Sequence, residues 1–124
     1  MRSYIQSLQY ALEGLFHALS RERNLKLFTA LYLISLMIAV ALRLTVIELA
    51  LVIFTGGIFL AVELINTALE RFTDAFDVHS KSIHTGAIKA TKDIAAGASL
   101  VCAVTWGVIL LMIFVPKVLS FLQR

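Results

Sequence analysis

The sequence has little charge and almost no proline. Of its 124 residues, 15% are charged, one is proline and 60% are hydrophobic. A soluble domain usually has about a quarter of its residues charged. The shortage of charge therefore argues against a soluble globular domain and indicates a small integral membrane protein. The length indicates a single domain over residues 1–124.

Several familiar signals are also absent. Cys102 is the single cysteine, so no disulfide can form within the chain, and its apolar neighbours predict a small buried residue. The N-terminus lacks the pattern of a cleavable signal peptide, and we expect none there. There is no zinc-ligand spacing, no Gly-x-x-x-x-Gly-Lys-Ser/Thr phosphate loop and no protein-kinase motif set. Any nucleotide site is therefore predicted to be unconventional.

Apolar periodicity predicts an all-α protein. Residues 3–20 have an apolar and a polar face at helical spacing, which is typical of a helix in the membrane interface. Residues 26–43, 48–75 and 93–115 contain three long apolar runs, each predicted to cross the membrane. The charged stretch 77–92 is the longest predicted loop, and Pro116 is expected to end the third membrane helix.

Basic residues predict the orientation of these helices. Eight of them share one side of this layout: Arg2, Arg21, Arg23, Lys26, Arg71, Lys81, Lys89 and Lys92. Only Arg43, Lys117 and Arg124 fall on the other side. By the positive-inside rule the first side, with the N-terminus, is cytoplasmic. Small residues at 56–57 and 95–99 predict close helix packing, and three such helices bury so little that an oligomer is expected.

A polar face at the end of the second apolar run is the strongest functional signal. Glu63, Asn66, Thr67 and Glu70 are three, four and seven residues apart, which places them on one side of a helix. A carboxylate at a membrane border is costly unless it is paired or used. This face is therefore where we expect the chemistry.

Further candidates lie before the first and at the third apolar run. Glu22 could join Glu63 and Glu70, and such a carboxylate set suits a hard cation such as magnesium together with phosphates. Lys92 and Asp93 are expected at the start of the third membrane helix, where a lysine and unpaired helix amides bind phosphate. Acid, amide, lysine and metal together are what phosphoryl transfer requires.

The residues alone leave other interpretations open. The polar face could be a solvated border with interhelix hydrogen bonds, Glu22 a surface ion-pair member beside Arg21 and Arg23, and Lys92-Asp93 only a helix start. His84 could be an ordinary solvated residue or a nucleotide contact. As different kinds of protein, a small proton- or ion-conducting membrane protein and a structural assembly factor remain alternatives.

The stretches Glu63-Leu-Ile-Asn-Thr-Ala-Leu-Glu70 and Lys92-Asp93-Ile-Ala-Ala-Gly-Ala resemble the signature of the bacterial diacylglycerol kinase and undecaprenol kinase family. Glu22-Arg23-Asn24, Tyr10 and Gly14 match as well, so that the resemblance covers nearly the whole chain. It implies a small homotrimeric kinase of the bacterial inner membrane, with active sites between subunits at the cytoplasmic border. The substrates would be MgATP and a membrane lipid, with no nucleic acid involved.

The resemblance also implies roles for individual residues. Glu63 would be the general base toward the lipid hydroxyl, and Asn66 would orient groups beside it. Glu22 and Glu70 would hold Mg²⁺, and both would thereby contact the nucleotide. The remaining ATP contacts would be Tyr10, His84, Lys92 and Asp93. The Glu22-Arg23-Asn24 and Ala-Ala-Gly-Ala elements resemble the undecaprenol kinase branch, which favours undecaprenol as substrate, with diacylglycerol as the alternative.

Overall fold

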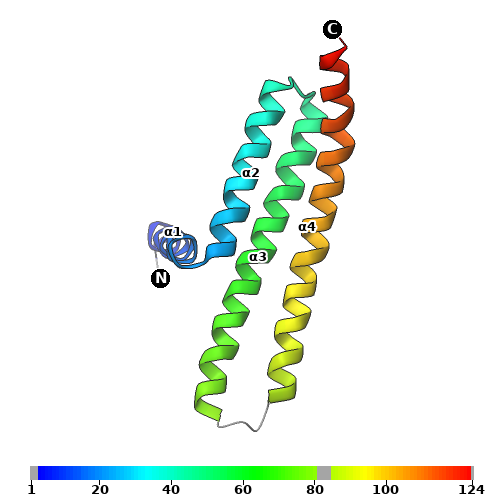
Figure 1. Cartoon of the computed structure of the whole chain (residues 1–124). Helices are drawn as coiled ribbons and strands as arrows, with labels where there is room; N and C mark the ends of the chain where they lie inside the picture. Colours follow the sequence, from blue (N-terminus) through cyan, green and yellow to red (C-terminus); the bar gives the residue numbers. More distant parts are fainter. Residues whose placement is uncertain (1–2, 81–84, 124) are drawn as a thin grey trace.

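A computed structural model describes the backbone of residues 3–80 and 85–123, and the side chains of residues 3–76 and 86–123. These residues form four α-helices and no strand (Figure 1): α1 Tyr4–Arg21, α2 Arg23–Ala41, α3 Val46–Ser80 and α4 Thr85–Leu122. The segments Arg23–Ala41, Val46–Phe76 and Gly86–Leu122 are long and apolar enough to cross a membrane. The all-α prediction, with an N-terminal helix before three membrane helices, is confirmed.

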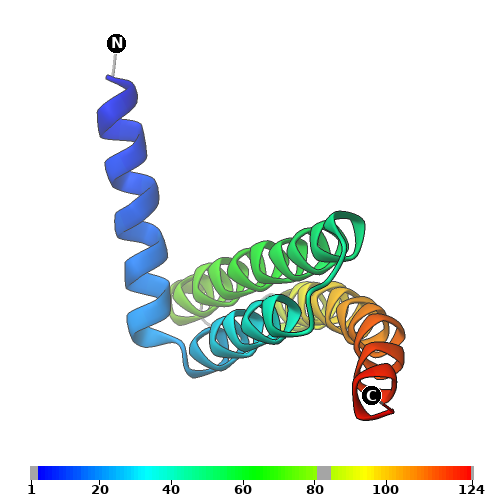
Figure 2. The ribbon, with the colours of Figure 1, turned by 90° about the horizontal axis from the view of Figure 1, so that it is seen from above.

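Helix α1 lies apart from the other three. A capping box begins it: the Ser3 hydroxyl accepts from the Ile5 amide at 3.3 Å, and the Gln6 side chain accepts from the Ser3 amide at 3.2 Å. No residue of α1 is buried, and the helix projects sideways from the bundle (Figure 2). An amphipathic helix set across the axes of membrane helices has the disposition of an interfacial helix.

The lengths of the helices differ, and α3 extends well beyond α2. The 19 residues of α2 rise about 28 Å, close to the hydrocarbon thickness of about 30 Å. The 35 residues of α3 rise about 52 Å, so α3 runs well beyond the start of α2, and α4 accompanies it (Figure 1). Glu63 lies about 26 Å along α3 from Val46, at the level where α3 leaves the region that α2 spans.

A tight turn holds α2 and α3 side by side. Arg43 has a φ of 51°, and the Leu44 and Arg43 amides donate to the carbonyls of Ala39 and Val40 at 3.1 and 3.0 Å. This is a Schellman motif, which ends α2 and satisfies its last carbonyls. Thr45 then caps α3, because its amide donates to Glu48 at 2.7 Å.

Phe59 of α3 is the centre of the apolar core. Its ring packs edge-on to Phe28 of α2 at 4.9 Å and stacks on Trp106 of α4 at 5.5 Å. Tyr32 packs against Trp106 and donates its hydroxyl to the Ile53 carbonyl at 3.1 Å. Gly56 lies directly under the Tyr32 ring, so the predicted close packing at this glycine is real.

Two boundary predictions were wrong. Most of the stretch 77–92 is not a loop, because α3 continues through Ser80 and α4 already begins at Thr85. Charged residues of this stretch therefore lie on the ends of two long helices. Pro116 does not end the last helix, which continues to Leu122. In an apolar medium the backbone groups of a helix can hydrogen-bond only to one another. The loss of one hydrogen bond at a proline therefore costs less than the loss of all the helical hydrogen bonds that follow it.

Candidate functional site

Glu63 is a carboxylate buried between two helices. Its side chain is only 6% exposed, and its Oε2 accepts a hydrogen bond from the hydroxyl of Ser99, a buried residue of α4. An unpartnered carboxylate in such a place costs several kcal/mol, and a hydroxyl donor offsets part of that cost. Packing of α3 on α4 therefore holds the Glu63 carboxylate in a fixed place between the two helices.

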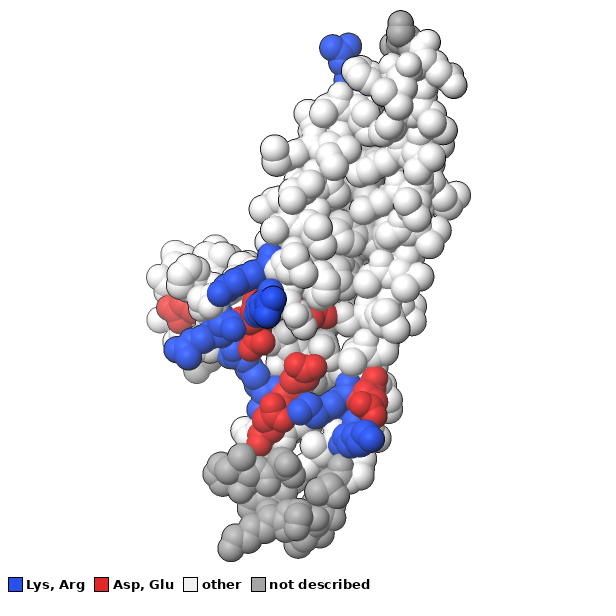
Figure 3. Space-filling view, in the orientation of Figure 1, with Lys and Arg blue, Asp and Glu red and all other residues white. Residues whose placement is uncertain are grey.

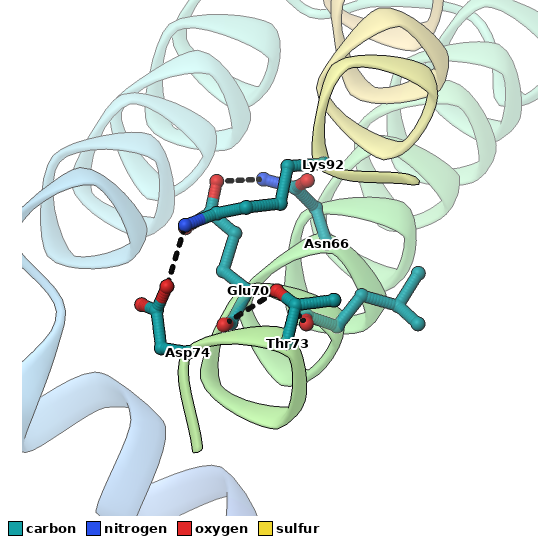
Figure 4. Close-up of polar contacts among 6 residues, drawn as sticks. Asn66, Glu70, Thr73, Asp74 and Lys92 are labelled. Atoms are coloured by element: carbon teal, nitrogen blue, oxygen red, sulfur yellow. Dashed lines mark hydrogen bonds and ion pairs between the residues drawn. The ribbon is translucent and has the colours of Figure 1, made fainter. Parts of the chain in front are cut away.

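Asn66 lies one turn farther along α3. Its Nδ2 donates to Oε1 of the half-buried Glu70 at 3.2 Å (Figure 4), and Thr67 beside it is buried. The Oδ1 of Asn66 is buried too, and it has no hydrogen-bond partner within the described part of the chain. A buried amide oxygen without a donor is uncommon and marks a place where a further group fits.

An apolar groove of about 320 Å³ lies between α3 and α4 beside this amide. Asn66 and Thr91 are its polar lining residues. The others are Val62, Ile65, Leu69, Ile94, Ala95 and Ala98. Glu63 does not line the groove, because its carboxylate is turned toward Ser99. The groove is suited to a hydrocarbon chain whose polar end reaches Asn66.

Lys92 joins α4 to α3 on the same side. Its ammonium contacts Asp74 at 2.6 Å, reaching across alongside Asn66 and Glu70 (Figure 4). The Lys92 side chain is 35% exposed and that of Asp74 is 66% exposed, so the pair faces solvent. The sequence suggested that Lys92 stands at the start of a helix. It lies instead within α4, which begins at Thr85. No unpaired helix amides are therefore available beside it.

Glu22 occupies the corner between α1 and α2. Both Nε and Nη2 of Arg71 donate to its Oε1, at 3.0 and 2.7 Å. Arg21 and Arg23 were the partners suggested by sequence, but the ion pair forms with a residue of α3. This contact places Glu22 beside Arg71, which follows Glu70 in the chain.

Two further candidates are exposed. Tyr10 lies on α1 and is 55% exposed, and Asp93 is exposed next to Lys92 on α4. His84 lies outside the described residues. Charged side chains gather at this end of the molecule, at and beyond the level of α1, while most of the bundle above it is uncharged (Figure 3).

The residues here fit a metal–phosphate complex better than a metal ion alone. No group of three or more His, Cys, Asp or Glu residues in the described ranges could hold a metal ion. Magnesium, however, usually takes only one or two protein carboxylates and completes its shell with phosphates and water. Glu70, beside the unpartnered amide oxygen of Asn66, offers oxygen ligands of that kind, whereas the Glu22 carboxylate is held by Arg71 and would have to leave it to join them.

Sequence reasoning assigned no role to three residues of this site. Asp74 could have been found, because it lies four residues after Glu70 and continues the same helical face. Ser99 lies seven residues after Lys92, again on one face. Arg71 carried no such signal, because its partner Glu22 is 49 residues away in the chain.

Comparison with known proteins identifies the family of the chain. Residues 9–114 match the family model described as prokaryotic diacylglycerol kinase. The chain is 33% identical over 118 residues to an undecaprenol kinase of Bacillus subtilis (strain 168), covering 94% of this chain and 92% of that protein. It is 32% identical over 116 residues to a diacylglycerol kinase of Synechocystis sp. (strain ATCC 27184 / PCC 6803 / Kazusa), covering 94% of this chain and 65% of that protein. No solved structure matches significantly.

Proposed function

Because the chain belongs to the prokaryotic diacylglycerol kinase family, and is therefore a bacterial membrane lipid kinase, we propose that it transfers the γ-phosphate of MgATP to the hydroxyl of undecaprenol. A kinase requires a nucleotide and a divalent metal, and the hard oxygen ligands at the site favour Mg²⁺ among such metals. We place the protein in the cytoplasmic membrane with its N-terminus and site on the cytoplasmic side, because most basic residues lie at that end.

The observation that carries this proposal is the buried Glu63 beside the Asn66 amide and the apolar groove. In the proposed reaction the lipid hydroxyl oxygen attacks the γ-phosphorus, the bond to the bridging oxygen of ADP breaks, and Glu63 takes the hydroxyl proton. Because the Glu63 carboxylate faces Ser99 in the structure, its side chain would turn toward the groove to take this proton, and Asn66 would orient the groups next to it. Chemistry and family resemblance together support both proposed roles.

The nucleotide would lie on the solvent side of the same residues. Glu70 and Glu22 would hold the metal ion, which would neutralise phosphate charge. The Lys92 ammonium would release the Asp74 carboxylate and bind a phosphate group. Asp93 and the exposed Tyr10 would contact the rest of the nucleotide. Since α1 buries none of its residues on its own bundle, we further propose a homotrimer in which α1 of one subunit completes the site of its neighbour.

The lining of the groove favours undecaprenol over diacylglycerol. A polyprenol is a hydrocarbon with one hydroxyl, whereas diacylglycerol brings two ester groups that need polar partners when they are buried. Asn66 and Thr91 are the polar lining residues, which is enough for a single hydroxyl. An assay with labelled ATP and each lipid in turn decides the question. Much faster phosphorylation of diacylglycerol would contradict this preference.

Substitution Glu63→Gln tests the role of the base. Glutamine keeps the size of the side chain and can still bond to Ser99, but it cannot take a proton. We expect a folded protein with phosphoryl transfer reduced by about 10²-fold or more. Glu48→Gln, at the opposite end of the same helix, is the matched control and should leave the rate unchanged. A folded Glu63→Gln variant of normal activity would remove Glu63 as the base.

Ion conduction, the alternative raised by the sequence, finds no support along the bundle. A relay needs ionisable groups through the depth of the membrane. On α3 no acidic or basic residue lies between Glu48 and Glu63, and on α4 none lies between Asp93 and Lys117. Apart from Glu48, the acids instead gather at one end, as nucleotide chemistry requires.

A further inference from the structure

A second polar site lies at the opposite end of the bundle, away from Glu63 and Lys92. There a cavity of about 570 Å³ opens between the α2–α3 turn and the last turns of α4. Its lining combines two cations, one hydroxyl and three apolar groups: Arg43, Lys117, Ser120, Ala41, Leu42 and Phe121. The proposed kinase mechanism uses none of these residues.

Arg43 is placed at the cavity by its backbone. Its φ of 51° is a left-handed conformation, which arginine adopts here because the Schellman motif of the turn requires it. The side chain is exposed, and the described residues provide it with no ion pair or hydrogen bond. A full positive charge is therefore held at the mouth of the cavity without a counter-charge from the described chain.

Lys117 provides the second cation from α4. Its ammonium contacts Glu48 of α3 at 3.0 Å, and Glu48 is itself held by the amide and hydroxyl of Thr45 at 2.7 and 2.9 Å. An ammonium has three N–H donors, so one carboxylate does not exhaust it. The Glu48 contact positions the ammonium and leaves donors for another acceptor. The hydroxyl of Ser120, almost one turn farther on, adds a further donor to the cavity.

Among the described residues, the balance of charge at this end is positive. Arg43 and Lys117 contribute two positive charges and Glu48 one negative charge. The negative end of the α2 dipole is offset by the positive end of α3, which begins five residues after α2 ends. The carboxyl end of α4 contributes about half a negative charge, which does not cancel the excess.

We propose that this cavity binds the phosphate headgroup of an anionic membrane lipid. Arg43 would contact the phosphate in the two-pronged geometry that guanidinium groups favour, with Lys117 as a point charge beside it. The turn lies between the predicted membrane spans Arg23–Ala41 and Val46–Phe76, at the level of lipid headgroups. Ala41, Leu42 and Phe121 provide an apolar wall along which the acyl chains would descend, which a free phosphate ion does not need.

The test measures thermal unfolding of the full-length protein in lipid nanodiscs. Discs of phosphatidylcholine alone are compared with discs that contain phosphatidylglycerol, and with phosphatidylcholine discs in buffer with inorganic phosphate. The key variant is Arg43→Asn, because asparagine accepts a positive φ readily and removes the charge without straining the turn. Lys26→Gln, at the other end of α2, is the control that loses the same charge.

Wild type and Lys26→Gln should gain several degrees in midpoint from phosphatidylglycerol, and Arg43→Asn should lose most of this gain. Arg43→Asn should also unfold no earlier than wild type in phosphatidylcholine alone. An equal gain in wild type and Arg43→Asn overturns the proposal. So does a gain from inorganic phosphate that matches the gain from the lipid, because the cavity would then bind free phosphate.

Discussion

At the scale of single residues, Ser99 is the one on which the placement of Glu63 depends. Ser99→Ala removes the hydroxyl that donates to the buried Glu63 carboxylate. Because a buried acceptor without its donor costs about 1–3 kcal/mol, we expect a loss of stability of that size. Thermal or chemical unfolding in a mild detergent measures it. Phosphoryl transfer should fall as well, because the carboxylate loses the contact that orients it.

Thr105→Ala is the matched control for Ser99→Ala. The Thr105 hydroxyl also lies on α4, but it is exposed and donates only to the Val101 carbonyl of its own helix, at 2.8 Å. Its removal should change stability by less than about 0.5 kcal/mol. If the two alanine variants were equally stable, the Ser99–Glu63 hydrogen bond would contribute nothing to the stability of the fold.

We expect Lys92 to contribute to phosphoryl transfer and very little to stability. Its contact with Asp74 is partly exposed, and such pairs contribute at most about 1 kcal/mol. Lys92→Ala should therefore leave the unfolding midpoint almost unchanged. If Lys92 neutralises phosphate charge, the same variant should lower phosphoryl transfer by about 10²-fold or more. Lys89→Ala removes the same charge from an exposed position of α4 and should alter neither quantity.

At the scale of helices, Gly56 decides how closely α2 approaches α3. A Cβ at this position would lie 2.5 Å from Cδ2 of Tyr32 and 3.0 Å from the indole nitrogen of Trp106. The Tyr32 ring has little room to move, because its hydroxyl is bonded to the Ile53 carbonyl. Gly56→Ala should therefore destabilise the bundle by about 1–3 kcal/mol, which thermal unfolding measures.

Gly57 is the natural comparison for Gly56. Nothing lies within 4 Å of a Cβ built there, and alanine is a better helix former than glycine by about 0.5–1 kcal/mol. Gly57→Ala should leave the stability unchanged or raise it slightly. Equal losses for the two variants would mean that helix flexibility, and not contact with Tyr32, explains the need for glycine.

The sequence predicted the types of the helices better than their ends. Long apolar runs identified three membrane helices, because a single segment of about 20 apolar residues satisfies its own backbone in lipid only as a helix. The ends were predicted wrongly at residues 77–92 and at Pro116. There charge was taken to indicate a loop and proline to end a helix, as both often do in soluble proteins. The extensions lie beyond the level of α2, where hydrophobicity no longer distinguishes a helix from a loop.

The same limit applies to the site. Helical spacing placed Glu63, Asn66 and Glu70 on one face, and the structure joins Asn66 to Glu70. Contacts between helices could not be predicted, because helix rotation and tilt are set by packing and not by spacing within one segment. The Ser99–Glu63 and Glu22–Arg71 contacts are of this kind.

At the scale of the whole molecule, both α1 and the bundle leave large apolar side chains exposed. The bundle has large exposed apolar side chains along its length, which lipid can cover, but α1 leaves it sideways and buries no residue on it (Figure 2). Tyr10 lies near the middle of α1, whereas Glu22 is tied to its own bundle through Arg71. A shared active site would therefore take Tyr10 from one subunit and Glu22, Glu63 and Glu70 from the next.

Mixing two defective variants tests this arrangement. If Tyr10 contacts ATP in a neighbour's site, Tyr10→Ala and Glu63→Gln impair different halves of each site. Subunits of the two kinds, unfolded together and reassembled, would then form some sites with both halves intact. The activity of the mixture should exceed that of either variant treated alone. A mixture of Glu22→Gln and Glu63→Gln should show no such recovery, because both defects fall in the same half. Recovery in neither mixture would contradict the contribution of α1 to a neighbouring site.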